Sequence, residues 1–277
     1  MAQLVDFSQI VIGSYMMASK FSDADIDTVR PAVLNTLRLY RTKFVSEFGE
    51  LILCCDDRKT WRKEIFPNYK ASRKKTRAAT SIDWENLYEC LNQLKEELTE
   101  WFPYKLIQVE KAEADDIIAV LVELINERSL ILSSDKDFVQ LHGFNVRQYS
   151  PMQKKFVEGD AKWNLHEKII KGDVGDGVPN IMSDDNVFID EGRRQKPITK
   201  KKVDAWYEID PDMYCSSEML RNYNRNKQLV DLSEVPESIR INITKRFETT
   251  KVGDRKRLLT YFINHRLKNL TESLSEF

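Results

Sequence analysis

Carboxylates follow three short apolar runs of this chain and stand at the head of a fourth apolar segment. They are Asp6, Asp56, Asp135 and Asp137 after the runs, and Glu113 and Asp115 at the head of the segment. Carboxylates gathered in one place repel one another unless cations lie between them. Hard divalent ions with oxygen ligands, Mg²⁺ or Mn²⁺, suit such a set. The pattern therefore predicts a metal site made of acidic side chains.

Two ions of this kind, held about 4 Å apart, stabilise the attacking and leaving oxygens of a displacement at phosphorus. The segment GDVGDGVPN supplies two further acids, Asp173 and Asp176, between glycines. Asp-Gly pairs mark ordinary turns, so this segment alone is weak support. If the turn lies against the acidic crevice, both side chains could hold the second ion. The chemistry that these residues favour is phosphodiester hydrolysis.

Each acid also has a structural explanation. An aspartate after a strand is most often a turn residue or a helix cap, and acids in the first turn of a helix interact favourably with its dipole. The repetition of an apolar run followed by an acid, three times in one chain, favours the metal site over these explanations.

Strands and helices alternate in the first half of the chain. The predicted strands are the start of LVDFSQIVIGSY, an apolar run stopped by Asp6, and then LILCC, YKLIQVE, SLILSSD and FNVRQYS. Between them, helical patterns begin at the SDADID segment (22–27) and at Ser81, and a third covers residues 112–127. The alternation predicts an α/β fold with a mostly parallel central sheet flanked by helices. In such a sheet the carboxyl ends of the strands share one edge, where the acids would meet.

The pattern changes after Pro151. MQKKFVEGDAKW is polar and irregular, the following segment is a short helical pattern broken by glycines, and from Lys196 onward the signal is helical and charged. We therefore predict an α/β domain over residues 1–157 and a smaller helical domain over 158–277.

A basic segment follows Asp56. Between residues 58 and 77 the chain has nine lysines and arginines (58, 59, 62, 63, 70, 73, 74, 75 and 77) and one acid, Glu64. Charge runs are usually solvated surfaces. This one contains aromatic residues as well, which suits contacts with phosphates and stacking on the bases of a single strand. It lacks a clean helical face, so we expect a mobile bridge or a loosely formed pair of helices.

Several classes of protein are disfavoured. No apolar stretch is long enough to span a bilayer, and nothing resembles a signal peptide. Four cysteines without ligand spacing indicate reduced thiols in a cytosol, and three scattered histidines leave oxygen as the metal ligand. FSQIVIGS, after the first strand, lacks the phosphate-binding glycine loop expected of a small-molecule phosphotransferase.

The order VDFSQ, LCCDD, FPNYKASRKK, EKAEADDIIA, LSSDKDFVQL and KGDVGDGVPN resembles the flap endonuclease and 5′-exonuclease family, and within it the ribonuclease H branch of T-even-type bacteriophages. The likeness covers nearly the whole chain. It implies a PIN-like nuclease core and a C-terminal domain with a helix–three-turn–helix that grips duplex through its phosphates. It also implies a Mg²⁺-dependent 5′-to-3′ exonuclease with ribonuclease H and 5′-flap endonuclease activity, which removes RNA primers and flaps during lagging-strand replication.

The resemblance also implies roles for individual residues. The first ion would be held by Asp6, Asp56, Glu113, Asp115 and Asp135, and the second by Asp137, Asp173 and Asp176, with Asp116 as a supporting acid. Lys70 and Arg73, at the base of a helical arch around residues 58–80, would contact the scissile phosphate. The catalytic residues would be Lys70, Arg73, Asp115 and Asp135. The arch would bind nucleic acid through Arg62, Tyr69, Lys70, Arg73, Lys74, Lys75 and Arg77.

Two departures from the family pattern GDxxDNxxG concern the glycine turn. Gly177 stands where the family has Asn, and Asn180 stands in place of the last Gly. The segment after it lacks the usual glycine hairpin, which puts a monovalent-ion site there in doubt. Only five residues precede Asp6, so an N-terminal tail for a sliding clamp is not expected.

The expected partners are RNA–DNA hybrid, 5′-flap and forked DNA, with a single-strand-binding protein and other replication proteins as further candidates. We expect a cytoplasmic monomer that contacts no membrane, in the host cytoplasm if a phage encodes it. The alternative function is a catalytically silent, structure-specific DNA-binding protein. That alternative requires lost metal ligands, and the sequence shows none lost in the first set.

Overall fold

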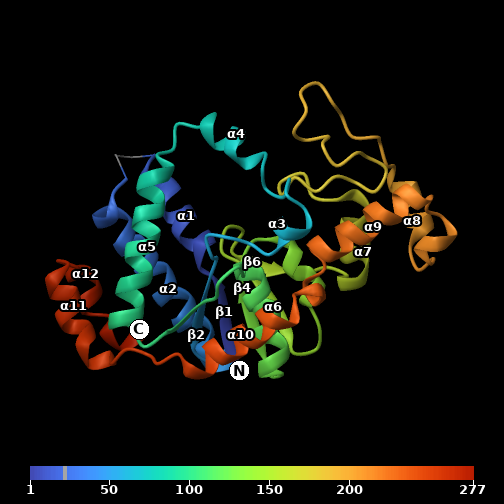
Figure 1. Ribbon diagram of the computed structural model, residues 1–277. Helices are drawn as coiled ribbons and strands as arrows, with labels where there is room; N and C mark the ends of the chain where they lie inside the picture. The colour runs from blue at the N-terminus through green and yellow to red at the C-terminus, as the bar shows by residue number, and fades with distance from the viewer. Residues whose placement is uncertain (21–23) are drawn as a thin grey trace.

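The computed structural model describes residues 1–20 and 24–277 and has a six-stranded sheet at its centre, in the order β3-β2-β1-β4-β5-β6 (Figure 1). The strands are β1 (Ala2–Asp6), β2 (Leu51–Cys55), β3 (Lys105–Gln108), β4 (Ser129–Leu132), β5 (Val146–Ser150) and β6 (Lys155–Val157). The first five are parallel, and only β6 pairs antiparallel, with β5. The predicted α/β fold with a mostly parallel sheet is confirmed.

Helices cover both faces of this sheet. One face packs against α1 (Phe7–Ala18), α2 (Ile26–Phe48), α5 (Trp84–Trp101), α11 (Leu258–Asn264) and α12 (Lys268–Thr271). The other packs against α6 (Ala114–Ile125) and α10 (Glu237–Thr249). Strands β1, β2 and β4 are buried along their whole length, which explains their continuous apolar sequences.

Two predicted segments differ from the structure. The first strand ends at Asp6, as predicted, but the small and polar residues expected after it form helix α1, whose buried Phe7, Ile10, Val11 and Tyr15 follow a helical spacing. The segment predicted to be irregular after Pro151 contains β6, a three-residue edge strand too short for a periodic signal. The start of α2 is capped by Asp25 in a reciprocal pair with Thr28; the Ser22 part of the predicted start signal lies outside the described residues.

The basic segment crosses from one side of the molecule to the other above the edge of the sheet (Figure 1). It contains two short helices, α3 (Arg62–Ile65) and α4 (Arg73–Ala78), and α4 buries no residue. We call residues 58–80 the bridge. A pair of short helices was one of the two predicted forms of this segment.

Beyond the bridge, α7 (Ala161–Lys171), α8 (Lys200–Trp206) and α9 (Ser217–Val230) form a smaller helical region with two apolar clusters, one of which includes Phe66 and Tyr69 of the bridge. The chain then returns to the sheet. Leu232 and Ile243 join the core under α6, and Tyr261 and Phe277 join the core on the opposite face. Short 3₁₀ helices connect the main elements: η1 (Lys136–Leu141), η2 (Pro211–Met213), η3 (Leu232–Glu234), η4 (Arg255–Arg257) and η5 (Leu274–Glu276). In the part of the chain described, no helix combines the length and apolar character needed to cross a membrane.

A buried ion pair ties the returning C-terminal segment to α2 and α5. Both carboxylate oxygens of Glu97 accept hydrogen bonds from Arg30 at 2.9 Å, and Tyr261 donates to the same carboxylate at 2.6 Å. Although burial opposes ionisation, these hydrogen bonds hold the pKa of Glu97 below its usual value. Three helices therefore depend on one charged carboxylate.

We expect Glu97→Gln to lower the free energy of unfolding by about 3 kcal/mol at pH 7, because it leaves a buried guanidinium without its main counter-charge. Since the pKa of Glu97 is lower in the folded state, its contribution is complete above the unfolded-state pKa, about 4.3, and is lost as the pH falls through the folded-state value. Urea unfolding at pH 7 and pH 3.5 measures this, with Glu96→Gln, an exposed position on the same helix, as control. An equal loss in the variant at both pH values would contradict the assignment.

Candidate active site

Four acids meet at one edge of the sheet because their strands are neighbours. In the order β2-β1-β4, Asp6 is the last residue of β1, Asp56 follows β2 directly, and Asp135 follows β4. The fourth, Asp115, stands in the first turn of α6. Asp56 Oδ1 accepts the backbone N–H of Ala114 at 2.9 Å, which fixes the start of α6 beside the strand ends.

These four acids lie close enough to influence one another's charge. Burial, followed by the charge of Asp56, raises the pKa of Asp6 to about 7. Burial, followed by the charges of Asp6 and Asp135, raises the pKa of Asp115 well above its usual range. Among the described residues, no ion pair joins any of the four to a lysine or arginine. The cluster consists of oxygen donors whose ionisation is opposed by burial and by one another, and a hard divalent ion would favour their charged forms.

The cluster is not a preformed cage. Within residues 1–20 and 24–277, no three His, Cys, Asp or Glu side chains are arranged to hold a metal ion as they stand. Binding would therefore require the carboxylates to turn toward the ion.

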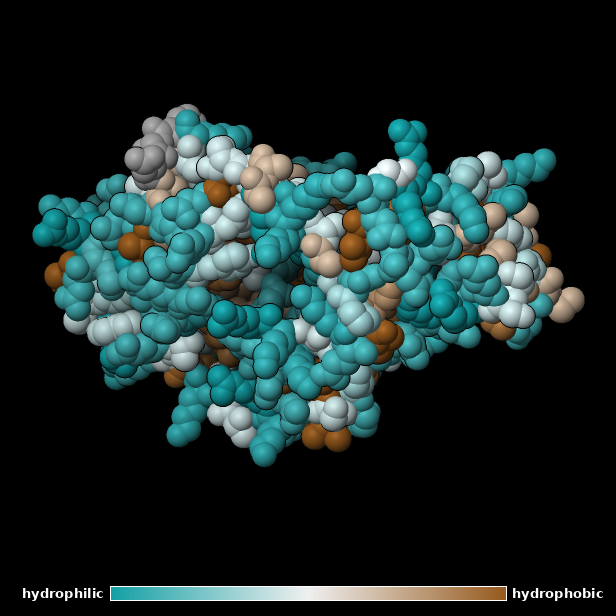
Figure 2. Space-filling model, turned by 45° about the horizontal axis from the view of Figure 1, so that its top comes forward, coloured by the Kyte–Doolittle hydropathy of each residue, from teal (hydrophilic) through white to brown (hydrophobic). Residues whose placement is uncertain are grey.

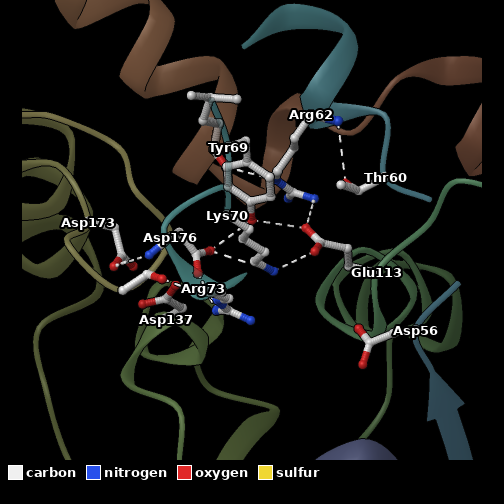
Figure 3. A network of polar contacts seen from close by, with 12 residues as sticks. Asp56, Thr60, Arg62, Tyr69, Lys70, Arg73, Glu113, Asp137, Asp173 and Asp176 are labelled. Carbon is white, nitrogen blue, oxygen red and sulfur yellow. Dashed lines mark hydrogen bonds and ion pairs between the residues drawn. The ribbon is translucent and has the colours of Figure 1, made fainter. Parts of the chain in front are cut away.

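The other predicted ligands are neutralised by basic side chains of the protein (Figure 3). Lys70 Nζ pairs with Glu113 and lies 3.6 Å from Asp176 Oδ2, and Arg73 also pairs with Asp176. Burial alone would raise the pKa values of Glu113 and Asp176. Lys70 and its basic neighbours nevertheless hold both values below the usual range. The acids thus divide into an unpaired group and a group already paired with cations.

Lys168, on α7, was not predicted from the sequence. Its Nζ pairs with Asp137 and lies 2.8 Å from Asp173 Oδ2, so that it occupies the space between two predicted ligands of the second ion. The sequence signal was a lysine in the last helical turn before Gly172. A lysine there is commonly explained by the helix dipole alone, so the signal was not specific.

Arg62 and Asp116 are paired with each other in the interior. Arg62 is 2% exposed and Asp116 is fully buried. Their side chains lie 2.8 Å apart, Arg62 also donates to Glu113 and to the carbonyl of Leu229, and Trp61 Nε1 donates to Asp116 at 3.0 Å. Arg62 is therefore not available to a nucleic acid in this structure. The pair joins the bridge to α6 and α9 instead.

Two further bridge residues, Tyr69 and Arg77, contact other side chains of the protein. The hydroxyl of Tyr69, a residue only 3% exposed, lies within hydrogen-bonding distance of Glu113 and Asp176, at 3.0 and 2.8 Å, so the ring is not open for base stacking. The guanidinium of Arg77 lies over the rings of Trp84 and Tyr88. Among the basic side chains predicted to bind nucleic acid, those of Lys74 and Lys75 on α4 are exposed. The face of the molecule drawn in Figure 2 has a hollow near its middle, surrounded mainly by hydrophilic residues.

Comparison with known proteins adds to this geometry. Residues 2–169 match the family model described as 5′-3′ exonuclease, N-terminal resolvase-like domain, and residues 159–277 match the model described as T4 RNase H, C terminal. The chain belongs to the 5′-3′ exonuclease family. It is 34% identical over 295 residues to the ribonuclease H of Enterobacteria phage T4, a match that covers 99% of this chain and 95% of that protein. The family resemblance predicted from the sequence is confirmed, and with it a hydrolase that cleaves phosphodiester bonds.

Further relatives match a smaller share of this chain. The flap endonuclease Xni of Shewanella sp. (strain MR-4) is 27% identical over 192 residues, which cover 64% of this chain and 68% of that protein. Among solved structures, the bacteriophage T5 flap endonuclease, in a pseudo-enzyme–product complex with DNA and metal ions, has a TM-score of 0.66 at 20% identity and covers 89% of this chain and 98% of its own. The T5 5′-exonuclease with bound zinc has a TM-score of 0.64 at 20% identity, over 90% and 99% of the two chains. At these identities the structures support the fold alone.

Proposed function

We propose that this chain is a Mg²⁺-dependent 5′-to-3′ exonuclease that also cleaves the RNA of RNA–DNA hybrids and the 5′ flaps of duplexes. Its role would be to remove RNA primers and flaps during lagging-strand DNA replication. The observation that carries this proposal is the group of four acids that form no ion pair with any described lysine or arginine, at the edge of the sheet beneath a basic bridge. The activities named for the T4 and Shewanella relatives support the same conclusion.

The acids are assigned to two ions. The first would be held by Asp6, Asp56, Asp115 and Asp135 together with Glu113, and the second by Asp137, Asp173 and Asp176. Divalent ions bound there would neutralise charge on the phosphate and lower the pKa of an attacking water. Because Lys168 pairs with Asp137 and Asp173, it must leave that space before a second ion can bind.

The bridge would act on the nucleic acid directly. Lys70 and Arg73, once released from Glu113 and Asp176, would neutralise charge that develops on the scissile phosphate. Lys74 and Lys75 are exposed on α4 and would contact phosphates of the 5′ strand. We assign residues 1–157 to the nuclease domain and the helical region that follows to duplex binding, with replication proteins such as a single-strand-binding protein as further partners.

The proposal predicts short 5′ products from two labelled substrates, an RNA–DNA hybrid and a 5′-flap duplex, in the presence of Mg²⁺. EDTA should abolish cleavage of both. Affinity for duplex should fall steeply as the salt concentration rises, because phosphate contacts release counterions. Gel analysis of the products and a binding titration at several salt concentrations measure these outcomes. Binding without cleavage at every divalent ion would instead indicate a silent structure-specific DNA-binding protein.

A further inference from the structure

The backbone of Lys70 is in the left-handed region, with φ of 57°. A side chain with a Cβ is disfavoured there, so the conformation persists only where surrounding contacts hold it. One such contact is on the backbone itself: the Lys70 N–H donates to the carbonyl of Asp176 at 2.7 Å. The residue proposed to act on the phosphate is therefore held by the glycine turn at residues 172–180.

Other contacts attach the same part of the bridge, residues 66–73, to the region of this turn. Asn68 Nδ2 donates to the carbonyl of Asp185 at 3.2 Å and to Asn186 Oδ1 at 3.1 Å. Arg73 Nε donates to the carbonyl of Gly175 at 3.1 Å. We call residues 66–73 the leg of the bridge.

Gly177 lies directly against the leg. Its φ is 70°, and a Cβ added at this position would lie 3.3 Å from the carbonyl oxygen of Asn68 and 3.5 Å from Ser72 Oγ. A contact of 3.3 Å is tight, so the leg would have to move for a larger residue. This is the position at which the family pattern has Asn, and the glycine allows the leg to lie directly on the turn.

The turn and its partner segment are themselves fixed by α9. Arg221 donates to Asp185 Oδ1 at 2.9 Å, and Arg225 binds the same oxygen. The fully buried Asn226 donates to the carbonyls of Ile169 and Pro179, each at 2.8 Å. A continuous series of contacts therefore leads from α9, through Asp185 and the turn, to the backbone of Lys70.

We infer that Asn68 and Gly177 are positioning residues that dock the leg on Asp185, Asn186 and the glycine turn, and so hold Lys70 beside the acids before any substrate binds. The inference rests on the proposed function in one respect, the role of Lys70 at the phosphate. Because ordering a flexible segment costs conformational entropy, a leg that is ordered on folding does not incur this cost in the cleavage step. Loss of docking should therefore slow cleavage without lowering the affinity for duplex.

The test uses the full-length protein and the variant Asn68→Ala. Loss of its two hydrogen bonds should reduce the single-turnover rate of flap cleavage about 10-fold and leave the duplex Kd within about 2-fold of the unsubstituted protein. In hydrogen exchange without DNA or metal, the amide of Lys70 should exchange about 10-fold faster in the variant, since its docking is weakened. Asn92→Ala, an exposed position on α5, is the matched control and should change none of the three.

Gly177→Asn provides a second variant, because asparagine tolerates positive φ better than other residues with a Cβ. It should give the same pattern as Asn68→Ala, and either variant suffices if the other fails to fold. Unchanged exchange and an unchanged rate in both would overturn the inference, as would equal losses in rate and duplex affinity. Faster exchange in a protein whose unsubstituted form cleaves nothing would support docking and overturn the proposed function.

Discussion

Asp135→Asn is expected to lower the single-turnover rate of cleavage at saturating Mg²⁺ by about 10³-fold, because a charged ligand of a catalytic ion contributes several kcal/mol to the transition state. Asp135 shares the strand-end cluster with Asp6 and Asp115, and its charge raises the pKa of both. The asparagine oxygen can still accept the backbone N–H of Asp137, as Asp135 Oδ1 does at 3.0 Å, so η1 should keep its cap. Duplex affinity should stay within about 2-fold, since phosphate contacts elsewhere supply most of it.

Asp210→Asn is a closely matched control. Asp210 Oδ1 also caps a 3₁₀ helix by accepting a backbone N–H two residues ahead, from Asp212 at 3.0 Å, but it stands in the helical region at the start of η2. Its substitution should leave cleavage unchanged. Calorimetric titration with Mn²⁺ measures ion binding independently of activity and should show a weakened site in Asp135→Asn only. Normal cleavage by Asp135→Asn would remove Asp135 from the metal site.

The unpaired acids could be predicted because their positions depend on strand direction alone. A continuous apolar run predicts a buried parallel strand, and parallel strands place the residues that follow them at one edge. That argument places Asp6, Asp56 and Asp135 at one edge of the sheet. The order in which β2, β1 and β4 lie side by side then makes them neighbours. Sequence motifs then supplied the family.

The basic partners could not be predicted in the same way. Arg62 meets Asp116 across 54 residues, and Lys168 meets Asp137 from a helix of a different region. Long flexible side chains bury their charge only where tertiary packing brings a carboxylate to them. The spacing of residues along the chain does not predict which carboxylate that will be. An arginine in a basic segment therefore suggested a phosphate contact, whereas the structure buries it in a core ion pair.

Helix α1 was missed for a related reason. FSQIVIGSYMMA has an apolar pattern that both a strand and a helix can satisfy over a short window. Asp6 decides between them in the structure, because its side chain accepts the backbone N–H of Gln9 and so starts the helix where β1 ends. One carboxylate thus caps α1 and also lies in the acidic cluster.

Lys70→Ala is expected to reduce turnover about 10²-fold, the usual effect of removing one group that stabilises transition-state charge, and to change duplex affinity less than about 3-fold. The ammonium group pairs with Glu113 at the base of the bridge (Figure 3), and the proposed function requires it to reach the scissile phosphate. Glu113 keeps its contact with Arg62 at 3.0 Å in the variant, so the carboxylate is not left without a cation and the fold should persist.

Lys74→Ala separates this role from simple phosphate binding. Lys74 lies in the same segment but is exposed on α4, so its loss should weaken binding of the 5′ strand and reduce the salt dependence, with little change in the single-turnover rate at saturating enzyme. Lys70→Arg keeps the positive charge and should recover part of the rate. Rate and affinity measured for all three variants distinguish the two roles: equal losses in both quantities for Lys70→Ala would make Lys70 a phosphate contact like Lys74, and a fall in rate alone would place it at the scissile bond.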